Sequence, residues 1–135
     1  MESSKKIVTI TGITGFLGSH VCLTFLKDGT FKVRGTVRDK NNEKKIDPIK
    51  KAFGEYFDQL ELVEANLNDA ESLHKAIEGS TYVVHTASPF PLGEPKNERD
   101  LIDPAVNGTK AVMEGAHKHK VKRVVITSSC AAIEG

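Results

Sequence analysis

Short apolar runs alternate with longer amphipathic stretches along the whole chain. Five of these runs have the length of a β-strand, and they lie at residues 5–11, 31–37, 60–64, 82–86 and 121–127. Most of the stretches between them place apolar residues at roughly the 3.6-residue period of a helix. The pattern therefore predicts five strands separated by helices.

Glycine, proline and acidic residues indicate where the predicted helices begin and end. Gly29 can end the first helix in a left-handed conformation, and Asp69 is placed to cap the start of the third. Pro104 either kinks the last helix or lies in its first turn behind a capping Asp103. The helices are expected at residues 15–27, from the polar stretch 40–45 to about 53, at 69–77 and at about 97–117.

Strands and helices that alternate over short connections form parallel sheets with right-handed crossovers. The residues of the fifth run, 124–126, are apolar throughout, which is typical of a strand covered on both faces. No repeat or low-complexity linker interrupts the pattern. We therefore expect one α/β domain over residues 1–135, a Rossmann-type doubly wound parallel sheet that stops after its fifth strand.

The first strand runs directly into the sequence Thr-Gly-x-x-Gly-x-x-Gly, which begins at Thr11. Gly12 allows a sharp turn, Gly15 leaves room for phosphates near backbone N–H groups, and Gly18 lets the helix approach the sheet. A plain glycine turn would contain the same residues. The strand before the motif and the amphipathic stretch after it favour a dinucleotide-binding loop instead.

Basic residues follow the second strand, where a dinucleotide-binding unit meets the adenosine ribose about 20 residues beyond the glycine loop. A guanidinium at Arg38 suits a ribose 2′-phosphate, so the residues favour NADP over NAD. Asp39 is the competing feature, since a shift of one residue would direct its carboxylate to a free 2′-hydroxyl. A third interpretation is a solvated run of charges.

Polar residues also follow the later strands. Asn66, after the third strand, offers a donor and an acceptor to an adenine edge, but it could equally be a turn residue. The small residues 86–88 would let the backbone approach a cofactor, whereas His85 is more simply a packed histidine. At the end of the fifth strand, a hydroxyl of residues 128–129 could bind a substrate carbonyl, or it could serve only in a turn.

Composition narrows the class of protein further. A net charge of +1 gives no general attraction to nucleic acid or to an anionic membrane, and no apolar run has the length of a membrane span. The first six residues lack the apolar core of a signal peptide. Cys22 and Cys130 have no metal-binding spacing, and reduced thiols in a cytoplasmic protein explain them most simply.

Together these motifs resemble the extended short-chain dehydrogenase/reductase family. The resemblance is nearest to the branch of cinnamoyl-CoA reductases and dihydroflavonol 4-reductases. The segments that carry it are 8–19, 35–39, 83–89, 104–110 and 121–129. The resemblance implies an NADP-dependent oxidoreductase that reduces a carbonyl group of a small, often aromatic substrate.

The resemblance also implies roles for individual residues. Ser129 occupies the position of the family's catalytic serine, and no metal ligand is expected. The residues that correspond to cofactor contacts are Gly12, Thr14, Gly15, Phe16, Leu17, Gly18, Arg38, Lys45, Asn66, Leu67, Thr86, Ala87 and Ser88.

The chain departs from the family pattern in two respects. The family's Tyr-x-x-x-Lys pair is absent, because Tyr56 and Tyr82 are followed four positions on by leucine and threonine. Asn66 also stands where an acidic residue is usual. We therefore expect the cofactor-binding half of a reductase that is inactive alone. We also expect an uncovered apolar sheet edge that favours self-association.

Other functions share some of these features. A non-enzymatic NADP-binding or sensing module would use the same cofactor residues. Nucleic-acid binding through the basic segment 117–123, or a metal held by His117 and His119, is less favoured. Basic residues at the end of a helix complement its dipole, and no carboxylate or cysteine nearby would complete a metal shell. The expected partner is a small carbonyl substrate, with neither nucleic acid nor membrane.

Overall fold

Five parallel strands form one sheet in the order β3-β2-β1-β4-β5. The structure is a computed structural model that describes residues 6–67, 69–86 and 99–126, without the side chains of Phe16 and of residues 99–105. The strands are β1 (Ile7–Thr11), β2 (Lys32–Val37), β3 (Glu61–Glu64), β4 (Tyr82–His85) and β5 (Arg123–Ile126). The helices are α1 (Phe16–Asp28), α2 (Glu43–Phe53), α3 (Ala70–Ile77), α4 (Arg99–Lys118) and the 3-10 helix η1 (Gly54–Gln59).

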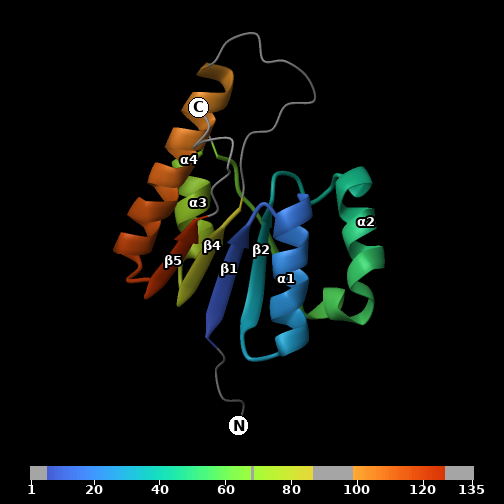
Figure 1. Ribbon diagram of the computed structural model, residues 1–135. Helices are drawn as coiled ribbons and strands as arrows, with labels where there is room; N and C mark the ends of the chain where they lie inside the picture. Colours follow the sequence, from blue (N-terminus) through green and yellow to red (C-terminus); the bar gives the residue numbers. More distant parts are fainter. Residues whose placement is uncertain (1–5, 68, 87–98, 127–135) are drawn as a thin grey trace, which may run out of the picture.

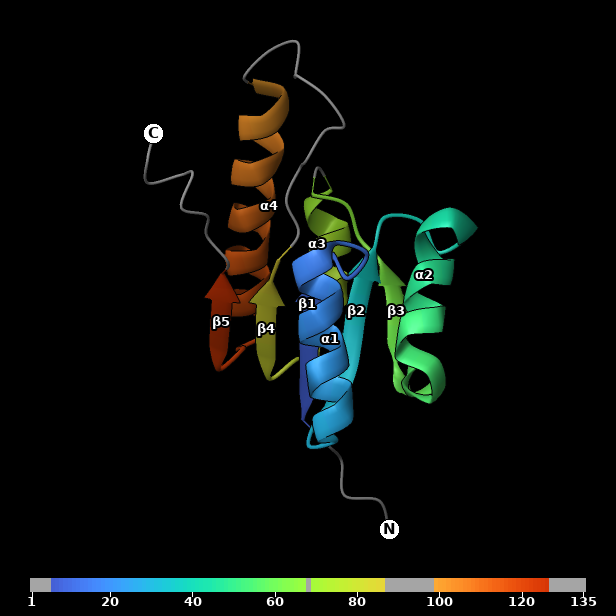
Figure 2. The same ribbon diagram turned by 45° about the vertical axis from the view of Figure 1, so that its right-hand side comes forward.

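The strand order reverses at β1, which pairs in parallel with β2 on one side and with β4 on the other. Helices α1 and α2 cover one face of the sheet, and α3 and α4 lie behind the other (Figures 1 and 2). The carboxyl ends of β1 and β4 therefore border the point at which ligands bind in open α/β sheets. This topology confirms the predicted Rossmann-type α/β fold.

A hydrophobic core fills each side of the sheet, as the alternation of side chains along the strands requires. Beneath α1 and α2 the buried residues are Val8, Ile10, Ile13, Cys22, Leu26, Val33, Val37, Ile46, Ile49, Phe53 and Val84. Beneath α3 and α4 they are Ala65, Leu73, Ala76, Ile77, Val83, Ala111 and Val112. The two cores hold the strand ends at a common edge.

The helix boundaries follow the predicted caps in most places. Gly29 is left-handed, with a φ of 76°, and its N–H donates to the carbonyl of Phe25 at 3.2 Å. Asp69 caps α3 by accepting the N–H of Ser72 at 3.2 Å. The 3-10 helix η1 was not predicted. Pro104 lies in the interior of α4, so the alternative that placed it in the first turn is wrong.

Strand β5 differs from the strand covered on both faces that its apolar sequence predicts. Val125 is 49% exposed and Ile126 is 42% exposed in the described part of the chain. Both residues are large and apolar, so the edge of the described sheet is apolar where β5 ends. None of the described helices combines the length and hydropathy that crossing a bilayer requires.

The thiol of Cys22 is fully buried in α1, and burial raises its pKa from 9.0 to about 12. Because the thiolate is the reactive form, we expect native Cys22 to react with a disulfide reagent at least about tenfold more slowly than the unfolded chain does. In a Cys130→Ser variant, Cys22 is the only thiol. The absorbance of the chromophore released from the reagent then measures the reaction rate of Cys22. Equal rates with and without denaturant would contradict the buried position.

Candidate functional site

The glycine motif forms a tight turn between β1 and α1. Gly12 has a φ of 71°, a left-handed conformation that glycine adopts without strain. The N–H of Gly15 donates to the carbonyl of Gly12 at 3.3 Å, and the carbonyl of Gly15 accepts the N–H of Ser19 at 2.9 Å. The turn therefore passes directly into the first hydrogen bonds of α1.

Gly18 brings α1 against this turn. A Cβ atom at position 18 would lie 2.1 Å from the carbonyl oxygen of Gly12 and 2.7 Å from Oγ1 of Thr86. A side chain at this position would therefore push the helix away from the turn and from β4. Among the described residues, and leaving out its chain neighbours, a Cβ at Gly15 would meet only the Gly12 oxygen, at 3.7 Å.

The N-terminus of α1 points its backbone dipole at this turn and has no side-chain cap. Gly15 is the N-cap residue, and the first turn of α1 contains no acidic residue. Unpaired N–H groups and the positive end of the dipole make such a terminus suitable for a phosphate. Thr14 is exposed, and Leu17 is 49% exposed, so both face away from the core at the turn.

A hydrogen-bonded network joins β1 to the end of β4. The hydroxyl of Thr11 lies 2.7 Å from Nδ1 of His85 and accepts the N–H of Thr86 at 3.1 Å. The hydroxyl of Thr86 donates in turn to the Thr11 carbonyl. His85 is buried, and burial lowers the pKa of its imidazole. It is thus a packed histidine, and it holds together the two strand ends beside the glycine turn.

Arg38 is exposed directly after β2. The competing Asp39 is engaged in a local turn, because its Oδ1 accepts the N–H of Asn41 at 2.9 Å. The backbone N–H of Lys40 donates to Glu64 at 3.0 Å, which ties this loop to the end of β3. Lys45 is exposed in the first turn of α2. The geometry thus supports Arg38 as the residue offered to a ligand at this position.

Asn66 lies in a tight turn after β3. Its carbonyl accepts the N–H of Asp69 at 2.9 Å, and its own N–H donates to the hydroxyl of Ser72 at 3.0 Å. The interpretation of Asn66 as a turn residue therefore has direct support, while its contact with adenine stays a prediction. The side chain of Leu67 packs on Gly108 of α4, where a Cβ would lie 2.3 Å from its Cδ2.

The structure brings part of the predicted site together. Gly12, Gly15, Gly18 and Thr86 lie close together at the carboxyl ends of β1 and β4, and Arg38 follows the neighbouring strand β2. Ala87, Ser88 and Ser129 lie outside the described residues, as does the side chain of Phe16.

Sequence analysis overlooked the threonines that hold the turn. The side chain of Thr11 bonds to β4, and Thr36 on β2 accepts the N–H of Gly12 at 3.0 Å. Both are fully or almost fully buried. The sequence did contain a signal for these residues, namely a polar residue near the end of an apolar strand.

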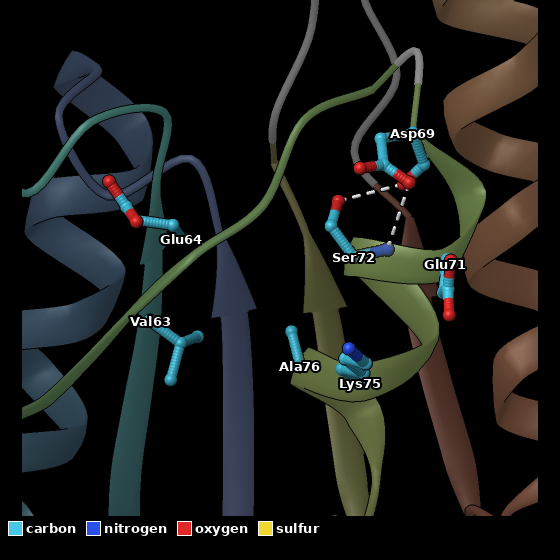
Figure 3. A pocket seen from close by; sticks show the side chains of 7 residues that line it. All are labelled: Val63, Glu64, Asp69, Glu71, Ser72, Lys75 and Ala76. Atoms are coloured by element: carbon cyan, nitrogen blue, oxygen red, sulfur yellow. Dashed lines mark hydrogen bonds between the residues drawn. The ribbon is translucent and has the colours of Figure 1, made fainter.

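A pocket of about 210 Å³ lies elsewhere, between β3 and α3 (Figure 3). Its lining includes the carboxylates of Glu64, Asp69 and Glu71 together with Lys75. Asp69 is already occupied in capping α3. Three carboxylates disfavour a phosphate-bearing ligand, so this pocket does not compete with the glycine turn as a dinucleotide site.

Comparison with known families agrees with this geometry. The model of the NAD dependent epimerase/dehydratase family matches residues 8–134. The chain belongs to this family. Within the described residues, no group of three or more His, Cys, Asp or Glu side chains is placed to hold a metal ion.

Curated relatives and a solved structure extend the comparison. The chain is 38% identical to cinnamoyl-CoA reductase CAD2 of Medicago truncatula, over 98% of the chain and 41% of that protein. It is 34% identical to dihydroflavonol 4-reductase of Hordeum vulgare, over 98% of the chain and 37% of that protein. Yeast methylglyoxal/isovaleraldehyde reductase Gre2, solved in complex with NADPH, matches with a TM-score of 0.74 and 31% identity.

These matches confirm the predicted family and its cinnamoyl-CoA reductase and dihydroflavonol reductase branch. The match to the yeast structure covers 93% of this chain and 38% of that one. The chain therefore spans about two fifths of the length of the relatives that it matches.

The buried imidazole of His85 should make stability depend on pH. Burial lowers its folded-state pKa below the ordinary value of 6.5, so below that pH the unfolded chain binds more protons. The contribution of His85 to the free energy of unfolding should therefore be fully present above about pH 6.5. It should be lost progressively on acidification, between about pH 6.5 and the lower folded-state pKa. Urea denaturation of the wild type and His85→Asn should show a shallower pH slope in the variant. Identical slopes would contradict the buried neutral form.

Proposed function

We propose that this chain is the NADP-binding part of a reductase that transfers hydride to the carbonyl group of a small, often aromatic substrate. The observation that carries the proposal is the glycine turn beneath an uncapped helix N-terminus at the point where the strand order reverses. Family membership and relatives named as carbonyl-type reductases support the same conclusion.

The turn fits the diphosphate of a dinucleotide. Gly15 has an ordinary φ of −80°, and a Cβ there would come no closer than 3.7 Å to any described residue beyond its chain neighbours. The fold itself therefore does not require glycine at this position, whereas a phosphate close to the backbone would. The exposed Thr14 and the N–H groups of residues 16–18 would hold the diphosphate, with Leu17 covering it.

The charges near the end of β2 support NADP in preference to NAD. The guanidinium of Arg38 would bind the ribose 2′-phosphate, and Lys45 would add a second positive charge. Asp39, the residue that would favour a free 2′-hydroxyl, is engaged with Asn41. The NADPH bound to the yeast relative agrees with this preference.

The remaining assignments rest on the family resemblance. Asn66 and Leu67 would border the adenine, and residues 86–88 would line the path of the cofactor toward its nicotinamide. Ser129 would be the catalytic residue that donates a hydrogen bond to the substrate carbonyl. Bound NADPH would supply the hydride. Neither Tyr56 nor Tyr82 is followed by Lys at the fourth position, so we assign cofactor binding, and not turnover, to these 135 residues.

The first test of the proposal is cofactor preference. NADPH should bind more tightly than NADH by one or two charge-assisted hydrogen bonds, each about 1.5–3 kcal/mol. Arg38→Ala should remove most of this difference, as measured by calorimetric titration of both cofactors. Lys27→Ala, in the exposed last turn of α1, is the matched control and should leave the difference unchanged. Equal titration curves for the wild type would refute the NADP assignment.

The second test concerns the turn. Gly15→Val should abolish dinucleotide binding and leave the fold largely intact, because its side chain would occupy the space of the diphosphate and not that of the protein. Circular dichroism checks the fold and calorimetry the binding. Affinity that survives in a folded Gly15→Val chain would mean that these glycines serve only the turn.

A further inference from the structure

The glycine turn is fastened to β2 by a side chain as well as by hydrogen bonds. Ile13, between Gly12 and the exposed Thr14, is fully buried. Its side chain lies over Gly35 so closely that a Cβ at position 35 would be 2.8 Å from both Cδ1 and Cγ2 of Ile13. Ile13 therefore packs directly against Gly35 and holds the turn to β2.

Two hydrogen bonds lock the turn to the next residue of the same strand. The N–H of Gly12 donates to Oγ1 of Thr36 at 3.0 Å, and the N–H of Ile13 donates to the carbonyl of Thr36 at 3.1 Å. Thr36 is 3% exposed, so water does not compete effectively for these groups. Three contacts therefore fix residues 12 and 13 relative to residues 35 and 36.

Arg38 lies directly after β2, only two residues beyond Thr36. The turn offered to the diphosphate and the guanidinium offered to the 2′-phosphate thus share one rigid support. We propose that Gly35 and Thr36 are positioning residues, which set the spacing between the phosphate-binding turn and Arg38 and thereby the preference for a 2′-phosphorylated dinucleotide. This inference rests on the proposed function.

A change in this spacing should alter the preference for NADPH over NADH more than it alters the affinity for NADH. NADPH has two anionic groups at a separation that its covalent structure restricts, so it gains from both only when the two protein anchors are in register. NADH has no 2′-phosphate, so of these two anchors it uses only the turn. A displaced turn should therefore reduce the advantage of NADPH over NADH, whereas a general loss of stability should affect both cofactors equally.

Gly35→Ala tests the spacing. Gly35 is not among the described residues with positive φ, and the three atoms nearest to a Cβ at this position all belong to Ile13, so alanine is strained there chiefly by that side chain. The ratio of the NADH to the NADPH dissociation constant should fall about tenfold, the value of one charge-assisted hydrogen bond. Gly35→Ala combined with Ile13→Ala removes Cδ1, Cγ1 and Cγ2 of Ile13, the three atoms nearest to the new Cβ, and should restore most of the ratio.

Val33→Ala is the matched control for stability. Val33 is 1% exposed on the same face of β2, two residues before Gly35, and it makes no hydrogen bond to the turn through its side chain. This variant should lower the denaturation midpoint and leave the cofactor ratio unchanged. If Gly35→Ala does not fold, Thr36→Val removes the hydroxyl that accepts from Gly12, keeps the side-chain shape, and should lower the ratio in the same direction.

The outcomes separate the inference from the proposed function. A wild-type chain that binds neither NADPH nor NADH refutes the proposed function, and the inference with it. A wild type that prefers NADPH, with the same preference in Gly35→Ala and in Thr36→Val, refutes the inference alone. So does a Val33→Ala chain whose ratio falls as far as that of Gly35→Ala, or a double variant that recovers nothing.

Discussion

The close approach of α1 to the carbonyl of Gly12 is the constraint on which the rest of this structure depends. A single carbon atom added at Gly18 would come within 2.1 Å of that oxygen, so only a residue without a side chain allows the helix to start here. Because the helix starts here, its N-terminus lies at the carboxyl edge of the sheet and not above its centre. That position directs the positive end of the helix dipole toward an anionic ligand.

The loop itself is short, and the neighbouring strands make it rigid. Thr36 holds it from β2, and Thr11 holds the end of β1 to Thr86, which directly follows β4. Each buried hydroxyl satisfies groups that would otherwise be costly to remove from water, so the turn has few alternative conformations. A preorganised turn binds a diphosphate without losing the entropy that ordering a flexible loop would cost.

Charged side chains are unevenly distributed around the glycine turn. The first turn of α1 contains no acidic residue, and Arg38 is exposed beyond β2. Three acidic side chains in this region accept backbone N–H groups: Asp39 from Asn41, Glu64 from Lys40 and Asp69 from Ser72. Each of these carboxylates is therefore held in place by a backbone donor.

The sequence by itself determined the strands, the helix caps and the glycine turn, because hydrophobic period and backbone freedom are local properties. Gly29 and Asp69 could be predicted as caps for that reason. Only the tertiary structure showed that Asp39 accepts the N–H of Asn41, placed Asn66 in a turn, and packed Ile13 onto Gly35. These outcomes depend on which residues meet across strands far apart in sequence, and a pattern along one chain does not contain that information.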